Sequence, residues 1–380
     1  MPLRVLHLIG SLGYGGVDHW LMNLLRLRRH EILIDFVVTS PGTLDAEARS
    51  LGANVHRIRP ADPFPWNNND LRGILLKHQY DAVHVHTAEY ACYALKTGAE
   101  CGISVRIAHA HSSGRPHPYS PKGVVRAAYH HTFNLSYCRK YATAILACSR
   151  DAGQFFFGRL WEKRRPEQMV YCGIPSAPYD VEFDRTKRLN LCRQYGLRED
   201  ALVIGHFGRL SYPKNQFFLI SVFAELARRN DRYILFVGGE GRLRKDLEEY
   251  VRKLNLDHRV VLPGSYQNGP ELACQLFDVF FLPSIYEGLP IVLMEAVAGG
   301  LHGICSDVIT REICDVVPEC FSVLSLNDPI VRWADALEEG INRKRLPQEG
   351  AATLRKTPFT IEQSMDSLLR VYRQGRGNLG

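Results

Sequence analysis

Two glutamates, Glu287 and Glu295, bracket an otherwise apolar segment that reads YEGLPIVLMEAVAGG over residues 286–300. A carboxylate that accepts hydrogen bonds from two adjacent hydroxyls is a common way to hold a ribose. Glu295 lies more than one helical turn after Glu287, so the two carboxylates are expected to contact different parts of one ligand. The alternative is a core helix with one exposed and one capping glutamate.

The start of that helix supplies further ligand contacts. A strand-like run, DVFFLPS (278–284), ends just before it, and the fixed φ of Pro290 suits a first helical position. The backbone amides of Gly288 and Leu289 then lie at a helix N-terminus, where they can bind a phosphate. We therefore expect residues 288–290 to form a phosphate-binding turn.

Two cations follow another strand in the segment GHFGRLSYPKNQFFLI (205–220). Neither Arg209 nor Lys214 is needed to build a sheet, and two cations at the carboxyl end of a strand can neutralise a diphosphate. The alternative is a pair of solvated surface cations. No D-x-D triplet occurs in the sequence, so nothing in it indicates a diphosphate held by a metal ion.

A glycine-rich turn, GSLGYGGVDHW (10–20), follows the first predicted strand. The amides of Gly15 and Gly16 could approach a phosphate, although a plain tight turn explains the same residues. The full dinucleotide-binding pattern is absent, because Asp18 stands where the third glycine would be. This lowers the odds of an NAD enzyme.

Histidines form two H-x-H pairs near the ends of two other predicted strands, His84 with His86 and His109 with His111. Side chains alternate along a strand, so each pair shares one face. If the two strands are neighbours, the four imidazoles could bind zinc and support a hydrolysis. No matching carboxylate motif accompanies them, so His84 and His109 are expected to be packed, hydrogen-bonded residues, and His111 is kept as functional.

The elements that position these residues alternate between short apolar strands and amphipathic helices, which predicts an α/β fold with parallel sheets. The pattern stops at a polar segment, 176–190, and then restarts. We expect two Rossmann-like domains facing a cleft, with ligands outside the carboxyl ends of the strands. The predicted domains are residues 1–184 and 185–359, and the helix within 360–380 is expected to complete the first. The predicted strands are 4–10, 31–39, 54–58, 81–86, 105–110, 143–148, 201–208, 233–239, 259–264, 278–284 and 301–307.

Composition sets wider bounds on function. The chain has 380 residues, a net charge of +7 and 46% hydrophobic residues, as in a globular protein with an anionic partner such as a nucleotide. No basic tract or zinc-finger spacing indicates nucleic acid. No apolar stretch is long enough to span a bilayer, and the start of the chain predicts a strand rather than a signal peptide. We therefore expect a cytoplasmic protein.

Together these motifs resemble the retaining glycosyltransferases of family 4, which have the GT-B fold. The resemblance runs over nearly the whole chain, and the ACS…FG and PSIYEGLPIVLMEA segments are most similar to the exopolysaccharide and capsule subgroup of the EpsF type. Its most specific parts are E-G-L-P-x-x-x-x-E (287–295), G-R-L-x-x-x-K-N (208–215) and V-G-G-E-G (237–241). The family often has Asn-Gly where this chain has Cys172-Gly173, which leaves the contacts of that turn open.

The resemblance implies a role for each candidate residue. Arg209 and Lys214 would bind the donor diphosphate and stabilise the departing nucleotide. Glu295 would hold the ribose, and Glu287 would contact hydroxyls of the donor sugar. The backbone N–H groups of Gly288 and Leu289 would bind the phosphate, and Pro290, which has no N–H, would lie beside it. In the first domain, Gly15 and Gly16 would approach the reacting centre, and His111 would lie beside the transferred sugar.

The implied activity is a retaining, metal-independent transfer of a sugar from a nucleotide sugar, with a UDP-sugar favoured. The implied acceptor is a glycan or lipid-linked glycan in surface polysaccharide synthesis, and no separate cofactor is expected. Basic residues on and around the predicted helix 122–140 fit either peripheral contact with the inner face of a membrane or an ordinary solvated helix. The alternatives are the zinc-dependent hydrolase and a non-catalytic nucleotide-sugar-binding protein.

Overall fold

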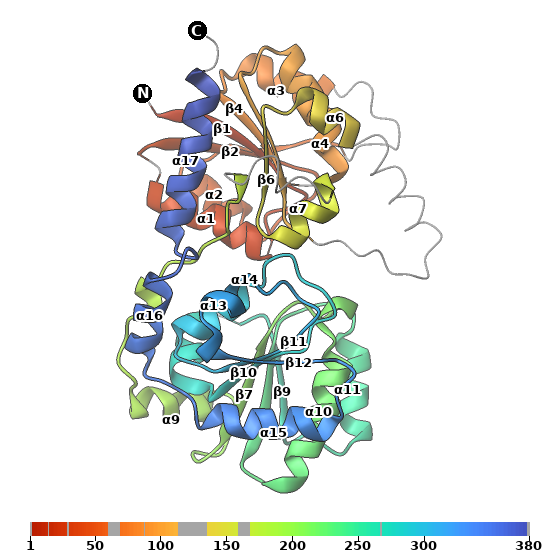
Figure 1. Ribbon diagram of the computed structural model, residues 1–380, viewed down its shortest axis with the longest axis vertical. Helices are drawn as coiled ribbons and strands as arrows, with labels where there is room; N and C mark the ends of the chain where they lie inside the picture. The colour runs from red at the N-terminus through yellow and green to blue at the C-terminus, as the bar shows by residue number, and fades with distance from the viewer. Residues whose placement is uncertain are drawn as a thin grey trace. The chain divides into compact units, whose positions relative to one another are not determined.

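The computed structural model describes residues 2–13, 15–28, 30–59, 69–86, 88–112, 135–158, 168–266 and 268–377. The chain divides into two compact units. Unit 1 comprises Met1–Gly173 with Ile361–Gly380, and unit 2 comprises Ile174–Thr360. Figure 1 shows the chain coloured from red at its start to blue at its end, so the blue helix of unit 1 stands out against red and orange elements.

A six-stranded parallel sheet forms the centre of unit 1, in the order β3-β2-β1-β4-β5-β6. Helices cover both faces of such a sheet, so its strands are almost continuously buried. The order of the strands reverses between β1 and β4, and this reversal is the point where ligands of doubly wound sheets bind. The strands are β1 (Leu3–Leu8), β2 (Ile32–Val38), β3 (Val55–Arg57), β4 (Ala82–Val85), β5 (Val105–Ala110) and β6 (Ala144–Ala147).

One helix of unit 1 comes from far along the chain. Helix α17 (Ile361–Gly377) packs against α1 (Gly16–Arg28), and the Nε1 group of Trp20 donates a 2.8 Å hydrogen bond to Oγ of Ser364. The apolar stripe Ile361, Met365, Leu368, Leu369 and Tyr372 is buried. The remaining described helices are α2 (Asp45–Ser50), α3 (Asn69–Lys77), α4 (Ala88–Glu100), α6 (Leu135–Tyr141) and α7 (Arg150–Phe157).

Unit 2 repeats this topology with a second parallel sheet, in the order β12-β11-β10-β7-β8-β9. Its reversal lies between β7 and β10. A cluster that includes Phe223, Phe281 and Trp333 forms the core on one face of the sheet. The strands are β7 (Leu202–Phe207), β8 (Tyr233–Gly238), β9 (Val260–Gly264), β10 (Val279–Leu282), β11 (Gly303–Ser306) and β12 (Phe321–Leu324).

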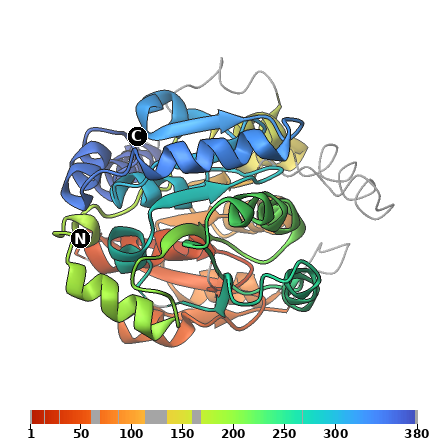
Figure 2. The same ribbon diagram turned by 90° about the horizontal axis from the view of Figure 1, so that it is seen from below.

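The helices of unit 2 cover its sheet, and Figure 2 shows from below how α15 (Ile330–Ile341, blue) runs along the sheet. None of the described helices in either unit has the length and apolar character that a membrane crossing requires. The other helices are α9 (Arg185–Gln194), α10 (Gln216–Arg229), α11 (Arg244–Lys253), α12 (Gly269–Glu271), α13 (Ile291–Ala298), α14 (Glu312–Val316) and α16 (Pro347–Arg355), with a π-helical turn at Leu272–Leu276.

Two differences from the sequence predictions have physical reasons, and a third prediction falls mostly outside the described residues. The division between the units falls at Ile174, earlier than the predicted boundary at 184/185, because Ile174 already pairs with Thr360 of unit 2. Strand β12 was not predicted, because its four residues alternate apolar and polar only once and follow a short 3₁₀ turn. The basic helix predicted over 122–140 lies mostly outside the described residues, and only α6 at its end is described.

Candidate functional site

The loops after β7 and β10, the two strands at the reversal of unit 2, are tied together. The backbone amide of Ile285 donates to the carbonyl of Pro213 at 2.8 Å, and Nδ2 of Asn215 donates to the carbonyl of Pro283 at 3.1 Å. Asn215 has a left-handed backbone conformation with φ of 57°, which asparagine tolerates well. These bonds bring the predicted cation loop beside the predicted glutamate loop.

Lys214 and Glu287 form an ion pair in this place. Nζ of Lys214 lies 2.6 Å from Oε1 of Glu287, and the side chains are 18% and 13% exposed. The Oγ group of Ser284 donates a second hydrogen bond, of 2.8 Å, to the same carboxylate oxygen. Ion pairs this well screened from water are held more rigidly than surface pairs. The structure therefore brings together two predicted site residues that lie far apart in the sequence.

Arg209, the second predicted cation, lies on the same loop but is exposed. Its guanidinium makes no hydrogen bond or ion pair with any residue in the described part of the chain. Its backbone carbonyl accepts a 2.9 Å bond from Nε2 of Gln216, which fixes the loop beneath the side chain. The planar guanidinium of Arg209 can therefore donate two parallel hydrogen bonds to an anion.

The turn that we expect to bind phosphate lies directly before α13, and Pro290 precedes the first residue of the helix instead of occupying the first helical position. Among the described residues, no hydrogen bond uses the backbone amide of Gly288 or Leu289. Free amides at the start of a helix, next to the Lys214–Glu287 pair, provide suitable donors for an anionic ligand.

Glu295 lies on α13, half-buried, and its carboxylate makes no hydrogen bond with a described residue. Burial raises the pKa of this carboxyl to about 7, while the charge of Lys214 acts in the opposite direction. Burial, with a contribution from the charge of Glu295, also raises the pKa of Tyr179 and Tyr266. A carboxylate that receives no hydrogen bond from the described residues, and whose pKa is raised by burial, is stabilised in its ionised form by any ligand that brings hydroxyl groups to it.

The glycine turn of unit 1 differs from the prediction. Oδ2 of Asp18 accepts hydrogen bonds of 2.9 Å from the amides of both Gly13 and Gly15. A carboxylate of the chain itself therefore fills the position where a phosphate was considered, and the predicted ligand contact through the Gly15 amide requires its displacement. Gly16 is the first residue of α1.

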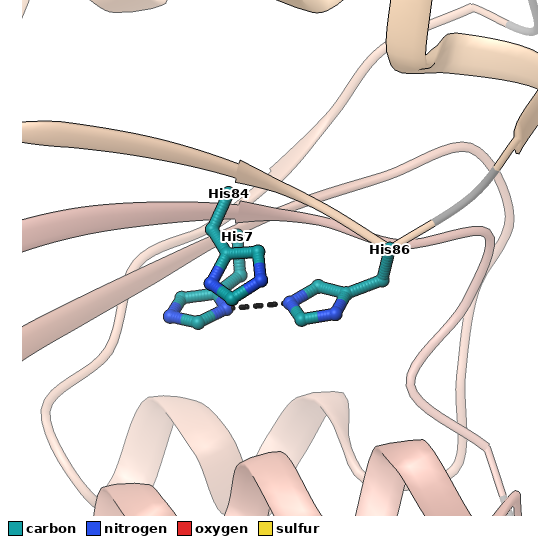
Figure 3. Close-up of side chains that lie close together, drawn as sticks. All are labelled: His7, His84 and His86. Carbon is teal, nitrogen blue, oxygen red and sulfur yellow. Dashed lines mark hydrogen bonds between the residues drawn. The ribbon is translucent and has the colours of Figure 1, made fainter. Parts of the chain in front are cut away.

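The histidines of unit 1 come together as the sequence suggested, because β4 and β5 are neighbours. A fifth histidine, His7, joins them from β1, where it lies opposite His84 in the register. Figure 3 shows His84 above His7, with His86 directed at the ring of His7. Four of the rings are buried, namely His7, His84, His86 and His109, and His111 is half-buried.

Hydrogen bonds link these rings to one another rather than to carboxylates. Nδ1 of His7 lies 2.8 Å from Nε2 of His86, and Nδ1 of His86 lies 2.8 Å from Nε2 of His111. The hydroxyl of Tyr372 lies 2.6 Å from Nδ1 of His84 and 3.4 Å from Nε2 of His7. Nε2 of His84 lies 3.1 Å from Nδ1 of His109. The prediction that His84 and His109 are packed, hydrogen-bonded residues is confirmed.

Burial keeps four of these rings neutral. It lowers the pKa of His7 to about 3, and it lowers the pKa values of His84, His86 and His109 well below the ordinary value, with neighbouring imidazoles adding to the effect. Trp20 covers the cluster, with ring centroids 5.8 to 6.0 Å from His86, His109 and His111.

A metal ion is the other ligand that such a cluster could take. In two groups, His7/His84/His86 and His86/His109/His111, one ring nitrogen from each residue lies within 4.8 Å of the others. However, every ring nitrogen of the five histidines except Nε2 of His109 already has a hydrogen-bond partner. The first group also stacks, with centroids 4.2 Å apart for His84 and His86, so its lone pairs do not converge well.

His111 does not present a free nitrogen. Its Nε2 faces His86, and its Nδ1 lies 3.4 Å from Sγ of Cys172. A hydrogen bond from Cys172, assisted by His111, lowers the pKa of the Cys148 thiol against the effect of burial, and burial raises that of Cys172. A substrate that contacts Nδ1 of His111 must therefore take the place of the sulfur.

The predicted residues thus fall into two groups, one at the reversal of each sheet. Sequence reasoning missed three participants. His7 could have been found from the usual strand order, which places the first strand beside the fourth. Tyr372 gave only a helical apolar signal, and Asp18 was read as a missing glycine rather than as an internal anion.

Comparisons with known proteins agree with this architecture. Residues 188–322, most of unit 2, match the family model described as "Glycosyl transferases group 1". The chain is 32% identical over 379 residues to the putative glycosyltransferase EpsF of Bacillus subtilis (strain 168), covering 97% of this chain and 96% of that protein. It is 24% identical over 249 residues to the UDP-Gal:alpha-D-GlcNAc-diphosphoundecaprenol alpha-1,3-galactosyltransferase of Escherichia coli, covering 62% of this chain and 60% of that one.

Among solved structures, Anabaena Alr3699/HepE in complex with UDP and glucose superimposes with a TM-score of 0.79. The identity is 17%, and the alignment covers 98% of this chain and 100% of that one. This likeness establishes the GT-B fold for the two sheets. With the near full-length similarity to EpsF, it shows that the chain belongs to the group 1 glycosyltransferases.

Proposed function

We propose that the protein is a retaining, metal-independent glycosyltransferase that uses a UDP-sugar donor and a lipid-linked glycan acceptor in surface polysaccharide synthesis. The observation that carries the donor half is the combination at the reversal of unit 2: the Lys214–Glu287 pair, the uncommitted guanidinium of Arg209 and the free amides before α13. These groups suit a diphosphate that carries a sugar.

Each group has a defined task in this proposal. Arg209 and Lys214 neutralise the diphosphate and stabilise the charge that develops on the departing nucleotide. Lys214 is shared between the phosphate and Glu287, and the carboxylate of Glu287 accepts hydrogen bonds from hydroxyls of the sugar. Glu295 accepts hydrogen bonds from the ribose diol, which replaces the donors that its crowded carboxylate lacks.

The proposed mechanism is a front-face substitution. The bond between the anomeric carbon and the phosphate oxygen breaks, and the acceptor hydroxyl attacks the short-lived oxocarbenium-like sugar from the same face. The acceptor's proton passes to the departing phosphate oxygen. Both glutamates are used for binding in this scheme, so neither is the nucleophile that retaining hydrolases employ. Catalysis then depends on positioning and on charge stabilisation.

The donor and acceptor are inferred from relatives. HepE was solved with UDP and glucose, and the Escherichia coli relative is described as a transferase that acts from UDP-Gal on a diphosphoundecaprenol-linked sugar. A polyprenyl acceptor implies work at a membrane surface, which is why we place the protein at the inner face of the membrane in peripheral association. The residues 122–134 that were considered for this contact lie outside the described part of the chain.

Thermal unfolding of the purified protein with UDP, GDP and ADP, in the presence of a chelator, tests the donor half. A ligand that binds only the folded state raises the midpoint. We expect UDP to raise it, and Glu295→Ala to remove most of the shift. The configuration at the anomeric carbon of the product, read by NMR, tests retention. Inversion, or activity that disappears with the chelator and returns with a divalent cation, would contradict the proposal.

A further inference from the structure

The backbone on both sides of Arg209 is hydrogen-bonded to the loop after β8. The amide of Gly208 donates to the carbonyl of Gly238 at 3.0 Å, and the amide of Leu210 donates to the carbonyl of Glu240 at 2.9 Å. The V-G-G-E-G motif permits this close approach, because a Cβ atom on its second or third glycine would overlap a backbone oxygen of the Arg209 loop. These bonds fix the neighbours of Arg209, and the carbonyl of Arg209 itself is held by another element.

That element is α10, through the side chain of its first residue, Gln216. Nε2 of Gln216 donates a 2.9 Å hydrogen bond to the carbonyl of Arg209, and it lies 3.5 Å from Nε2 of His206 on β7. Both side chains are fully buried. The hydroxyl of Ser211 also donates to this carbonyl, at 3.3 Å, but Ser211 belongs to the same loop. Gln216 is therefore the residue that ties the Arg209 carbonyl to the body of unit 2.

A backbone carbonyl of β10 fixes the direction of these bonds. Nδ1 of His206 lies 2.8 Å from the carbonyl oxygen of Phe281, which can only accept, so Nδ1 carries the proton. Burial lowers the pKa of His206 to about 4, so the ring is neutral near pH 7 and its Nε2 is a bare acceptor. The NH₂ group of Gln216 thus faces two acceptors, and its two protons match them.

The same orientation has a cost at the other atom of the amide. Oε1 of Gln216 is buried and has no hydrogen-bond partner among the described residues. A buried acceptor without a partner lowers stability, but reversing the amide would direct this oxygen at two other acceptors, which is worse. Gln216 therefore combines a local loss of stability with a firm hold on the Arg209 carbonyl, and such conflicts are expected at functional sites.

We propose that Gln216 is a positioning residue of the donor site: oriented by His206, it holds the backbone of Arg209 so that the guanidinium is presented to the diphosphate of the donor. This inference rests on the proposed function, because it takes Arg209 to bind that diphosphate. Lys214 has its own support in the pair with Glu287. Gln216 therefore acts through Arg209 rather than through Lys214.

A double-mutant cycle tests this coupling. Gln216→Met keeps the length of the side chain and removes both donors. The affinity for UDP, measured by calorimetry, should fall about three- to tenfold, because Arg209 then occupies its binding position for only part of the time. In the Arg209→Ala background the same change should cause no further loss, since residues that act as one unit are not additive. A further loss there, or an unchanged affinity in Gln216→Met alone, would overturn the proposal.

Gln275→Met is the matched control, because Gln275 is a second buried glutamine of unit 2. It accepts a 2.8 Å bond from the amide of Asp184 and donates a 2.8 Å bond to the carbonyl of Glu182. It precedes β10, whereas Arg209 follows the parallel strand β7, so the two lie at opposite edges of the sheet. Gln275→Met should lower the midpoint of thermal unfolding and leave the affinity for UDP unchanged. Equal losses of affinity in the two variants would show that Gln216 acts only through stability.

His206 allows two further measurements. In protein labelled with ¹⁵N-histidine, His206→Asn identifies the ring signals, and we expect the proton on Nδ1 alone; a proton on Nε2 would overturn the direction of the bonds. His206→Asn also keeps a short donor toward Phe281 and removes the acceptor for Gln216. It should weaken UDP binding less than Gln216→Met does, and again only when Arg209 is present, which provides a second cycle if Gln216→Met fails to fold.

The failure of this inference differs from the failure of the proposed function. If the wild type binds UDP but the cycle with Arg209→Ala is additive, the role of Gln216 is wrong and the donor site stands. If the wild type binds none of UDP, GDP and ADP, the donor site is wrong, and the role of Gln216 is wrong with it.

Discussion

The two units have the same sheet topology and gather polar residues at the same place, yet the two clusters are chemically opposite. Unit 2 places cations and carboxylates after β7 and β10, with Arg209 exposed and Lys214 paired to Glu287. Unit 1 gathers five imidazoles on or just after β1, β4 and β5. Burial keeps four of them neutral, and the fifth, His111, is partly exposed.

Burial explains this difference. Groups that remain charged must lie where a ligand, water or an opposite charge can stabilise them, so those of unit 2 lie in loops. Imidazoles can give up their charge, so those of unit 1 tolerate the interior of a sheet and satisfy one another with hydrogen bonds. Unit 2 therefore offers charged groups that suit an anionic ligand, whereas unit 1 holds its imidazoles in hydrogen bonds with one another.

The largest effect is expected from Lys214→Ala. This change removes a preorganised cation and leaves Glu287 without its partner, so kcat/KM should fall by about 100- to 1000-fold. Lys253→Ala, an exposed lysine in the last turn of α11, should leave the rate unchanged. Initial rates of transfer measure both. If the two variants behave alike, the charged cluster is only a surface feature and the comparison fails.

A smaller effect, on the affinity for UDP, is expected from Arg209→Ala. The Arg209 side chain has no hydrogen bond or ion pair with a described residue, so its removal leaves no group of the protein unpaired. Affinity for UDP, measured by calorimetry, should fall about tenfold, as for the loss of one charge-assisted hydrogen-bonded group. The midpoint of thermal unfolding without ligand should not move. Arg209→Lys should recover only part of the affinity, since it lacks the planar fork. Full recovery would show that charge alone matters there.

The pH dependence of UDP binding sharpens the contrast further. Burial raises the pKa of Glu295 to about 7, and hydroxyl groups of a ribose would stabilise its ionised form. Binding then releases a proton, so affinity should rise with pH up to about 7 and level off above it. The phosphate of UDP titrates nearby, so the Glu295→Gln variant, which cannot ionise, supplies the baseline. Parallel curves for the two proteins would contradict this role.

The smallest effect is a change of stability within unit 1. Tyr372→Phe removes the hydroxyl between His84 and His7 and leaves one buried nitrogen of each ring without its partner, which should cost about 1–3 kcal/mol. Tyr250→Phe removes a half-buried hydroxyl bond to Ser221 in unit 2 and should cost less. Thermal unfolding compares them. An equal or smaller cost for Tyr372→Phe would mean that the hydrogen bonds among the buried histidines contribute nothing to the stability of unit 1.

The two sheets were predictable because their strands leave local signals, and the residues proposed for the unit 2 site were chosen from signals of the same kind. Strands buried on both faces read as apolar runs, and Arg209, Lys214 and Glu287 directly follow such runs. The cations and glutamates could be recognised one loop at a time. Which of them pair was not predictable, because the Lys214–Glu287 contact depends on β7 and β10 being neighbours.

The histidine cluster was predicted only in part, for the same reason. His84 and His109 alternate visibly on their strands, whereas His7 is a single histidine in an apolar run. The contribution of Tyr372 depends on α17 packing against unit 1, which no local pattern encodes. Strand β12 and the Asp18 turn were missed because a short strand and a side chain that replaces a ligand both resemble ordinary loop sequence.

The return of α17 to unit 1 has a consequence for synthesis of the chain. A ribosome makes all the strands of unit 1 before it makes unit 2, but Ser364 and Tyr372 emerge only after unit 2 is complete. Domains generally fold as units as they emerge. Unit 2, which is continuous in sequence, can therefore complete its folding first. Unit 1 can complete its folding, and bury its histidine cluster beneath α17, only after the helix that follows unit 2 has been synthesised.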